Sequence, residues 1–309
     1  MKRFRPAPFF SPVVPALAAA LLLSACAGMP PRPRAPEAIT AESLSPQARE
    51  HRVWLVSADH QLQLVRAGRP DRIEQQVALR GLAAGDEVVG IDFRVARGVL
   101  YLLTRQGRLY TVDTGSGQLA PVGSGAPLAL ALPPGPLGFD FNPAADRIRI
   151  VGAAVNLRAH PDTGALVDGD PKAEGLQPDG ALRYAEGDPA RGRTPRIDAA
   201  GYTYNKTSDK LTTNYAIDQA AGALVMQGSL EGATPAVSPN TGLLSTVGPL
   251  GVKGFSDAAF DIADIDNTAL AALRTDRTRL YRIDLKSGQA QRIGPVGTGA
   301  PIRGLAIEP

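Results

Sequence analysis

Cysteine, histidine and aromatic residues are scarce in this chain of 309 residues, which contains one Cys, three His and 5% Phe, Trp and Tyr. A single cysteine excludes an internal disulfide and a thiolate zinc site, and three histidines leave little for a histidine-rich metal centre. The motifs G-x-S-x-G, G-x-G-x-x-G and H-E-x-x-H are also missing, as is a glycine-rich phosphate loop. The sequence therefore predicts no catalytic residues and no dedicated metal ligands, and it favours a protein that is not an enzyme.

A hydrophobic run long enough to cross a membrane as a helix is missing as well. The apolar stretch at residues 13–23 is too short, and it follows a basic segment with Lys2, Arg3 and Arg5. This order is typical of an export signal peptide. Its removal takes away three of the 33 basic residues and leaves as many basic as acidic ones, of which there are 30. A neutral mature protein gives no argument for a nucleic-acid partner.

The signal ends in Leu23-Ser24-Ala25-Cys26, which resembles the lipobox of bacterial lipoproteins. The resemblance implies cleavage before Cys26, a diacylglycerol on its thiol and an acyl chain such as palmitate on the new amino terminus. Several acyl chains give stable membrane anchoring. Ala27 is not the aspartate that often retains lipoproteins at the inner membrane, so we expect a lipid-anchored envelope protein in the outer membrane, facing the periplasm. The alternative is a secreted protein cleaved after a small residue.

Composition divides the chain into three parts. Residues 1–25 are the expected lipoprotein signal peptide. Residues 26–50 are rich in proline and poor in apolar residues, which is typical of an extended tether. Residues 51–309 have the composition of a folded domain.

Internal repeats give the architecture of this domain. The copies begin at Gly90-Ile-Asp-Phe, Gly138-Phe-Asp-Phe, Gly201-Tyr-Thr-Tyr, Ala259-Phe-Asp-Ile and Gly304-Leu-Ala-Ile. Most continue as apolar strand, turn, apolar strand, Asp and a turn with Gly, as in residues 99–123 and 279–294. Short apolar runs between Gly and Asp turns indicate strands and hairpins, and no segment of the domain has a sustained helical period.

The repeats predict an all-β fold, a β-propeller of five four-stranded blades. Residues 53–77 supply three strand-like runs without the opening strand, and residues 303–308 supply that strand alone. One blade shared between the two ends closes the ring, which an open β-solenoid would not explain. Six blades are the alternative, because the long segments 168–197 and 229–250 have room for further strands.

The segment Gly138–Val151 (GFDFNPAADRIRIV), followed by Asn156-Leu-Arg and Pro161-Asp-Thr-Gly, is similar to the bacterial domain-of-unknown-function family 4394. Further matching stretches are Gly90–Phe93, Gly107–Asp113, Leu182–Tyr184 and Leu244–Gly251. The resemblance covers about residues 53 to 308. It implies an exported, repeat-containing β domain, and it implies no particular activity.

Aligned positions on the first strands form the first candidate site. Asp92, Asp140 and Asp261 occupy the same position in three copies, and Thr203 and Ala306 replace them in the others. First strands line the central channel of a propeller, so these carboxylates would converge around a cation or a polar ligand. The alternative, which we favour, is that each carboxylate accepts backbone N–H bonds within or between blades.

A second polar group lies within seventeen residues of one copy. It consists of Asn142, Asp146, Arg147, Arg149, Asn156 and Arg158. Arg147 and Arg149 alternate with isoleucines, so one face of the strand carries both guanidinium groups, and Arg158 joins them across a hairpin. The group offers a bidentate contact to an anion or carboxylate. The alternative, again favoured, is a buried network of these arginines with Asp140 and Asp146.

Two functions remain open from the sequence. The favoured one is a binding or scaffolding module, held at the membrane through Cys26, for an envelope protein or glycan. The alternative is a hydrolase or lyase that uses the channel carboxylates, with or without a divalent cation, on a sugar or lactone. No cofactor is expected. The loop with Asp168 and Asp170 resembles a calcium loop, but its glycine and glutamate spacing departs from an EF-hand.

Overall fold

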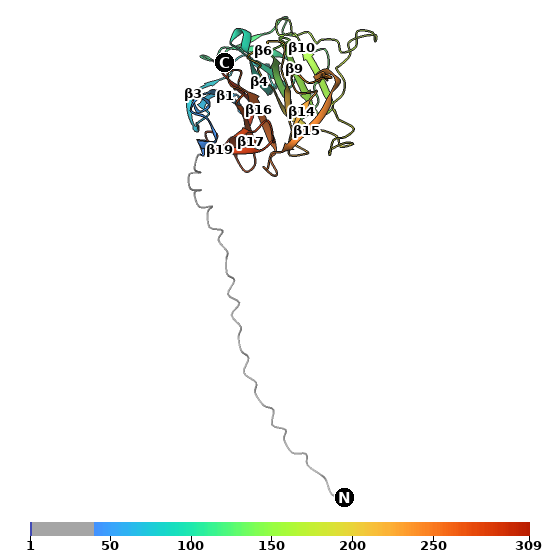
Figure 1. The fold of residues 1–309 in the computed structure, drawn as a ribbon. Helices are drawn as coiled ribbons and strands as arrows, with labels where there is room; N and C mark the ends of the chain where they lie inside the picture. The colour runs from blue at the N-terminus through green and yellow to red at the C-terminus, as the bar shows by residue number, and fades with distance from the viewer. Residues whose placement is uncertain (2–39) are drawn as a thin grey trace. The chain divides into compact units, whose positions relative to one another are not determined.

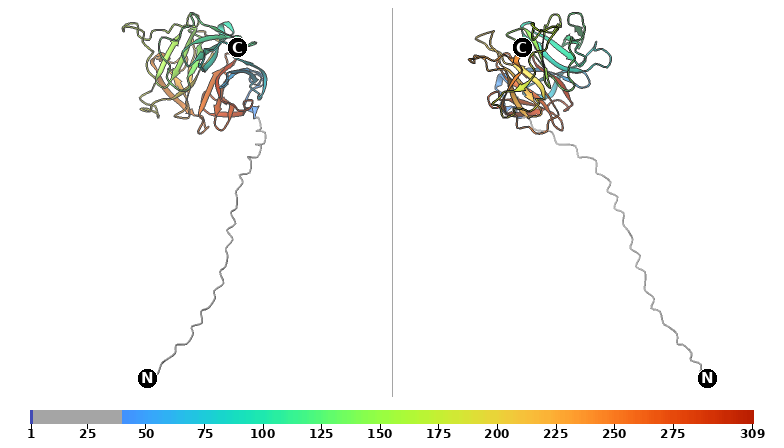
Figure 2. Two further views of the ribbon diagram at one scale, coloured as in Figure 1. Left: turned by 180° about the vertical axis from the view of Figure 1, so that it is seen from behind. Right: turned by 90° about the vertical axis from the view of Figure 1, so that its right-hand side faces the viewer.

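The computed structural model describes Met1 and residues 40–309. Cys26, the expected signal peptide and most of the expected tether lie outside the described residues. Residues 40–309 form five β-sheets arranged in a ring as the blades of a propeller (Figures 1 and 2), which confirms the all-β prediction with five blades. In this part of the chain no helix has the length and apolar character needed to cross a membrane.

Each blade has its first strand nearest the channel. Blade 1 consists of β20 (Ile302–Ile307), β1 (Arg52–Ser57), β2 (Gln61–Arg66) and β3 (Arg69–Ala78). Blade 2 consists of β4 (Val88–Arg94), β5 (Val99–Thr104), β6 (Leu109–Val112) and β7 (Leu119–Pro121). Blade 3 consists of β8 (Gly138–Asn142), β9 (Arg147–Gly152) and β10 (Val155–Ala159). Blade 4 consists of β12 (Ile197–Tyr202), β13 (Asn214–Asp218), β14 (Ala223–Gln227), β15 (Leu243–Pro249) and β11 (Arg183–Tyr184). Blade 5 consists of β16 (Asp257–Ile262), β17 (Ala269–Arg274), β18 (Thr278–Ile283) and β19 (Ala290–Pro295).

The two ends of the domain share blade 1, as the incomplete terminal repeats predict. The last strand, β20, pairs antiparallel with β1 and places Ala306 opposite Trp54. The indole N–H of Trp54 donates to Glu308 at 2.6 Å, and Arg52 forms an ion pair with the same carboxylate at 2.9 Å. The ring is therefore closed by strand pairing and by side chains of both ends.

The two long segments that left room for a sixth blade both belong to blade 4. Strand β15 pairs antiparallel with β14, and β11 adds to the outer edge of β15 in parallel. Blade 4 thus has five strands and blade 3 has three, so the prediction of four strands in every blade is wrong for these two. The alternative with six blades is wrong as well.

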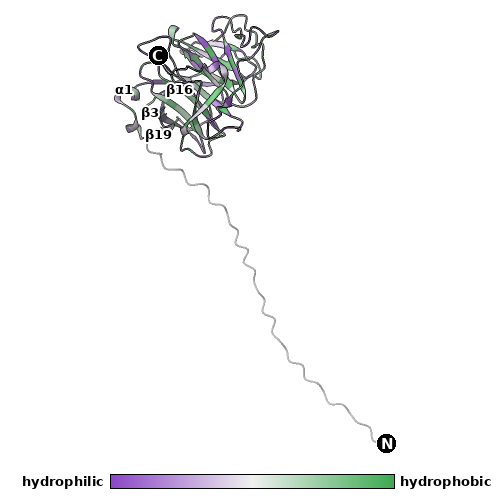
Figure 3. Ribbon diagram, turned by 45° about the vertical axis from the view of Figure 1, so that its right-hand side comes forward, coloured by the Kyte–Doolittle hydropathy of each residue, from purple (hydrophilic) through white to green (hydrophobic). Residues whose placement is uncertain are grey.

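Five hydrophobic clusters hold the ring together, one between each pair of neighbouring blades. Strands of the inner ring are buried on both faces, and β4 is buried along its whole length (hydrophobic stretches are green in Figure 3). Some first strands of neighbouring blades lie so close together that only glycine, which has no side chain, fits at the point of contact. A Cβ added at Gly138 would lie 2.7 Å from the Cβ of Ala200, so these first strands pack backbone to side chain across the blade boundary.

The compact unit begins earlier than the expected boundary at residue 51. Residues 41–43 form a 3₁₀ turn, and Pro46–Arg49 form the short helix α1, capped by the Ser45 hydroxyl. Leu44 and Ala48 are buried in the cluster between blades 5 and 1. Residues 40–50 therefore belong to the folded domain, because Leu44 and Ala48 supply the apolar contacts that a tether lacks.

We expect Leu44→Ala to lower the free energy of unfolding by about 2 kcal/mol, because it deletes a buried apolar side chain at the edge of a core cluster. Chemical denaturation of the full chain measures this loss. Glu42→Ala, at an exposed position two residues away, is the matched control and should change stability by less than about 0.5 kcal/mol. Equal stabilities of the two variants would show that residues 40–50 are part of the tether and not of the folded domain.

Candidate functional site

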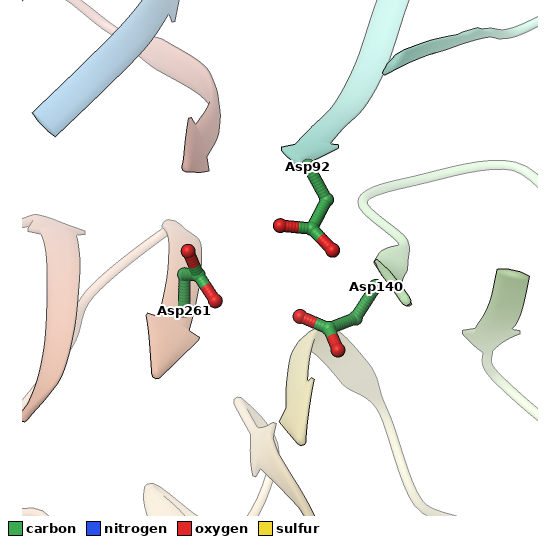
Figure 4. A group of neighbouring side chains, drawn as sticks. All are labelled: Asp92, Asp140 and Asp261. Atoms are coloured by element: carbon green, nitrogen blue, oxygen red, sulfur yellow. The ribbon is translucent and has the colours of Figure 1, made fainter. Parts of the chain in front are cut away.

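Three aspartates from the first strands converge at one end of the channel. Asp92 on β4, Asp140 on β8 and Asp261 on β16 each offer a carboxylate oxygen, and these oxygens lie within 4.8 Å of one another. Figure 4 shows the three side chains pointing toward a common space from three different blades. All three are buried. We call them the aspartate triad.

The carboxylates of the triad accept hydrogen bonds from backbone N–H groups within and between blades, as predicted by the interpretation of these aspartates as structural residues. Asp92 accepts from Phe93 and Phe141, Asp140 from Tyr202, and Asp261 from Ile262 and Ile307, at 2.6–3.0 Å. Each aspartate thus bonds the first strand of the next blade. Five N–H groups occupy five of the six carboxylate oxygens. Among the described residues, the remaining oxygen of Asp140 accepts no hydrogen bond.

The same bonds correct the alignment of the third repeat. Tyr202 donates to Asp140 as Ile307 donates to Asp261, so Tyr202 corresponds to Ile307. Gly201, one residue earlier, therefore occupies the aspartate position of blade 4. The prediction that Thr203 replaces the aspartate is wrong by two residues. The two positions of the inner ring without a carboxylate, Gly201 and Ala306, have little or no side chain.

The charges of the triad lack a positive partner. No lysine, arginine or histidine among the described residues forms an ion pair with these carboxylates. Burial, and then the charge of Asp261, raise the pKa of Asp92 well above its usual range. Burial and the charges of Asp92 and Asp261 do the same to the pKa of Asp140. Burial raises the pKa of Asp261 to about 6, although two backbone N–H groups act in the opposite direction.

The triad lines a cavity of about 230 Å³, which we call the channel-mouth cavity. Tyr202, Tyr204 and Asp264 contribute further polar groups to its wall. Arg94 and Asp146 also line it, but they are engaged with each other through hydrogen bonds, of which Nε to Oδ1 is 2.8 Å. Nη1 of Arg94 also donates to Oδ1 of Asp162 at 2.6 Å. Four acidic groups of this cavity therefore make no ion pair among the described residues: the three of the triad and the partly buried Asp264.

A second cavity, of about 220 Å³, lies beside the first and shares Asn142 and Tyr202 with it. Arg147, Arg149 and Arg158 line its wall, so we call it the arginine pocket. Pairing of β9 with β10 sets Arg149 directly opposite Arg158. Arg147 lies two residues before Arg149 on β9, so its side chain is on the same face. Strand alternation thus brings together the three arginines that the sequence places on one face.

Arg149 is the buried centre of this group, 2% exposed. Its Nε donates to the Tyr202 hydroxyl at 3.1 Å, and its two terminal nitrogens donate to Asn156, Asp179 and Asn240 at 2.6–2.7 Å. Burial acts to lower the pKa of Arg149, but Tyr202 and then Asp179, through charge and hydrogen bonds, outweigh it and raise that pKa above its usual range. Arg149 is therefore a fixed cation that positions its neighbours.

The predicted network of arginines and aspartates is present with a different acid. Asp179, on the loop before β11, accepts from Arg149 and binds Arg158 through both oxygens at 2.7 Å. Asp140 contacts none of these arginines, and Asp146 binds Arg94 instead. The prediction of Asp140 and Asp146 as the acids of this network was wrong, because Asp140 accepts from the Tyr202 N–H group and Asp146 pairs with Arg94.

The sequence candidates therefore divide between the two cavities. Asn142 lines both, Asp146 lines the channel-mouth cavity, and Asn156 lines neither. Asn156 is fully buried and bonds Gly180, Pro239 and Gln227, which makes it a structural residue. Sequence reasoning missed Asp179 and several residues of the cavity walls, among them Tyr202, Tyr204, Asp264 and Asn240.

The loop that resembles a calcium site uses its aspartates to close turns. Asp168 accepts from the backbone N–H groups of Asp170 and Gln177, and Asp170 accepts from that of Lys172, at 3.1–3.2 Å. Both carboxylates are local turn residues.

The fold and the converging side chains define a five-bladed β-propeller with two adjoining polar cavities at one end of its channel. The family model described as "Domain of unknown function (DUF4394)" matches residues 61–306, and the chain belongs to this family. No curated protein matches the sequence.

Three solved structures are similar to the chain at low sequence identity. A protein of unknown function from Bacteroides caccae shares 11% identity with a TM-score of 0.40, over 79% of this chain and 73% of that one. A chain of a nidogen/laminin complex shares 10% identity with a TM-score of 0.46, over 84% and 98%. A protein of unknown function from Bacteroides thetaiotaomicron shares 12% identity with a TM-score of 0.40, over 78% and 49%.

Proposed function

We propose that the domain is a ligand-binding module and that the aspartate triad holds a divalent cation, such as Ca²⁺, as part of its binding site. The observation that carries the proposal is the convergence of three buried carboxylates on one cavity, with no positive partner in the part of the chain that the structure describes. Buried charges in proteins are paired or bind metals, and otherwise they take up protons. A cation would replace those protons.

The donor set fits a hard cation. Calcium takes six to eight oxygen ligands, including carboxylates that bind through one or both oxygens. The triad supplies three carboxylates, and one oxygen of Asp140 is free of other bonds among the described residues. The oxygens that accept backbone N–H groups keep a second lone pair. Ligands of the bound molecule or water would complete the shell.

The module belongs, in this proposal, to the cell envelope. The lipobox at Cys26 supports a lipid-anchored protein at the periplasmic face of the outer membrane. A propeller held there would bind an envelope protein or a glycan. Hydroxyl-rich glycans are suitable ligands for a bound Ca²⁺, because their oxygens are hard donors.

We expect Ca²⁺ to stabilise the full-length chain by about 2.7 kcal/mol at a hundredfold excess over its dissociation constant. Asp140→Asn should abolish this effect, because it removes a charge and the one unengaged carboxylate oxygen. The Asn carbonyl oxygen can still accept the Tyr202 N–H, so the fold is retained. Calorimetric titration and thermal unfolding in EDTA and in Ca²⁺ measure both properties.

Asp170→Asn is the matched control for the loss of one carboxylate, since Asp170 is exposed and lies on the turn loop. It should leave the calcium effect unchanged. Wild-type protein that melts at the same temperature in Ca²⁺, Mg²⁺ and EDTA would reject the cation site and leave the triad as a shared-proton structural ring.

The alternative of a hydrolase or lyase rests on one observation, the raised pKa values of Asp92 and Asp140, which suit a general acid. The same variant separates the two functions. An enzyme would turn over a sugar or lactone substrate and would lose this turnover in Asp140→Asn, whereas a binding module would convert none in either form.

A further inference from the structure

We propose that the arginine pocket binds an oxyanion, the phosphate or carboxylate group of an acidic ligand. This inference goes beyond the cation site and does not depend on it. The pocket is a cavity of about 220 Å³ lined by Arg147, Arg149 and Arg158. Its further polar lining comes from Asn142, Tyr202, Ser238 and Asn240.

The pocket carries more positive than negative charge. Three guanidinium groups face one carboxylate, that of Asp179, which pairs with both Arg149 and Arg158. Among the described residues, Arg147 makes no ion pair and donates only to the carbonyl oxygens of Ala145 and Asp146. Asp146 itself turns its carboxylate to Arg94. The excess of positive charge in a concave site therefore favours an anion.

Hydrogen-bond donors without described partners are found on the pocket residues. Arg158 uses Nε and Nη2 for Asp179, and its Nη1 makes no hydrogen bond to the described residues. Arg147 uses Nη1 alone. The Asn240 carbonyl oxygen accepts from Arg149, an orientation that leaves the amide N–H₂ group as a donor. Planar guanidinium groups recognise carboxylate and phosphate through paired N–H bonds.

The buried network gives this pocket a rigid frame. Arg149 holds Asp179, Asn240 and Tyr202 at 2.6–3.1 Å, and Asn240 lies in the 3₁₀ turn Pro239–Thr241 that precedes β15. Groups fixed before binding lose little entropy when the ligand arrives. Tyr202 also donates its backbone N–H to Asp140, so one residue joins the pocket to the aspartate triad. A ligand with an acidic group beside hydroxyl groups, such as a uronic acid or a sugar phosphate, matches this pair of cavities.

The test is a titration of the full-length chain with inorganic phosphate and, separately, with glucuronate, at constant ionic strength in chloride. We expect saturable binding of at least one of them, detected by calorimetry and by a rise in melting temperature. Arg147→Gln should weaken binding about tenfold, the effect of losing one charge-assisted hydrogen bond. Arg147→Glu should abolish it.

Arg183→Gln is the matched control, because Arg183 is exposed, donates to backbone carbonyl oxygens as Arg147 does, and does not line the pocket. It should bind as the wild type does. Asp140→Asn should also retain oxyanion binding, so failure of the cation site and failure of the pocket are distinguishable. Preference for phosphate or for glucuronate identifies the acidic group. Equal, non-saturating responses of wild type, Arg147→Gln and Arg183→Gln would overturn the proposal.

Discussion

Replacing Asp179 with asparagine is expected to lower the free energy of unfolding by about 3 to 5 kcal/mol, the range seen when one partner of a buried ion pair is removed. Among the described residues, Asp179 is the one carboxylate bound to Arg149, whose side chain is 2% exposed. Its loss leaves that guanidinium buried without a countercharge. The new amide N–H₂ group would also face the donors of Arg158. Denaturation in urea measures the change.

Two further variants separate this charge effect from loss of packing. Arg158→Gln should be much less damaging, because Arg158 is partly exposed and the pair of Arg149 with Asp179 stays intact. The double variant Asp179→Asn with Arg149→Met should be more stable than the sum of the two single effects predicts, since no buried charge remains unpaired. A loss below about 1 kcal/mol in Asp179→Asn would contradict the assigned role of Asp179.

Much of the fold could be predicted because each propeller repeat has a short, local sequence pattern. Glycine turns, apolar strands and an incomplete copy at each end were enough for five blades and the shared closure. The boundary near residue 51 could not be predicted. Leu44 and Ala48 stand among prolines and charged residues, and their burial depends on a surface formed by blades 5 and 1.

The aspartate triad could be predicted in part because equivalent positions of repeated strands meet at the channel. The repeat containing Gly201 misled the alignment, since Gly-Tyr-Thr-Tyr matches the pattern two residues out of place. A shift of two residues keeps the same alternation of faces, so no sequence feature reveals it. The acid of the arginine network, Asp179, lies on an irregular loop outside the repeats. Only the path of that loop brings it to Arg149.

The stability of the wild-type protein without divalent cations is expected to fall as the pH rises from about 4 to above 6. The folded-state pKa of Asp261 is raised from 3.8 to about 6, and those of Asp92 and Asp140 are raised well above their usual range. In this window the folded protein binds more protons than the unfolded chain, so the free energy of unfolding decreases with pH. For Asp261 alone the decrease is about 3 kcal/mol.

Asp140→Asn should make this decline shallower, because one of the three titrating groups of the triad and one buried charge are gone. Asp198 and Asp264, whose pKa values burial also raises, titrate in both proteins. In EDTA at pH 7 we therefore expect the variant to be more stable than the wild type, because the folded variant holds one buried charge fewer. Carboxylates with lowered pKa, such as Asp188 and Asp266, are present in both proteins and cancel in the difference.

Saturating Ca²⁺ should reverse the order of the two proteins at pH 7, since the cation stabilises only an intact triad. It should have little effect at pH 5, where protons occupy the carboxylates. Denaturation of both proteins across this pH range, with and without Ca²⁺, gives the comparison. Parallel curves in EDTA would show that Asp140 titrates normally. The stability of the wild type could instead fall more steeply with pH in EDTA than that of the variant, with no reversal of their order in Ca²⁺. That result would show that the triad accepts backbone N–H groups and binds no cation.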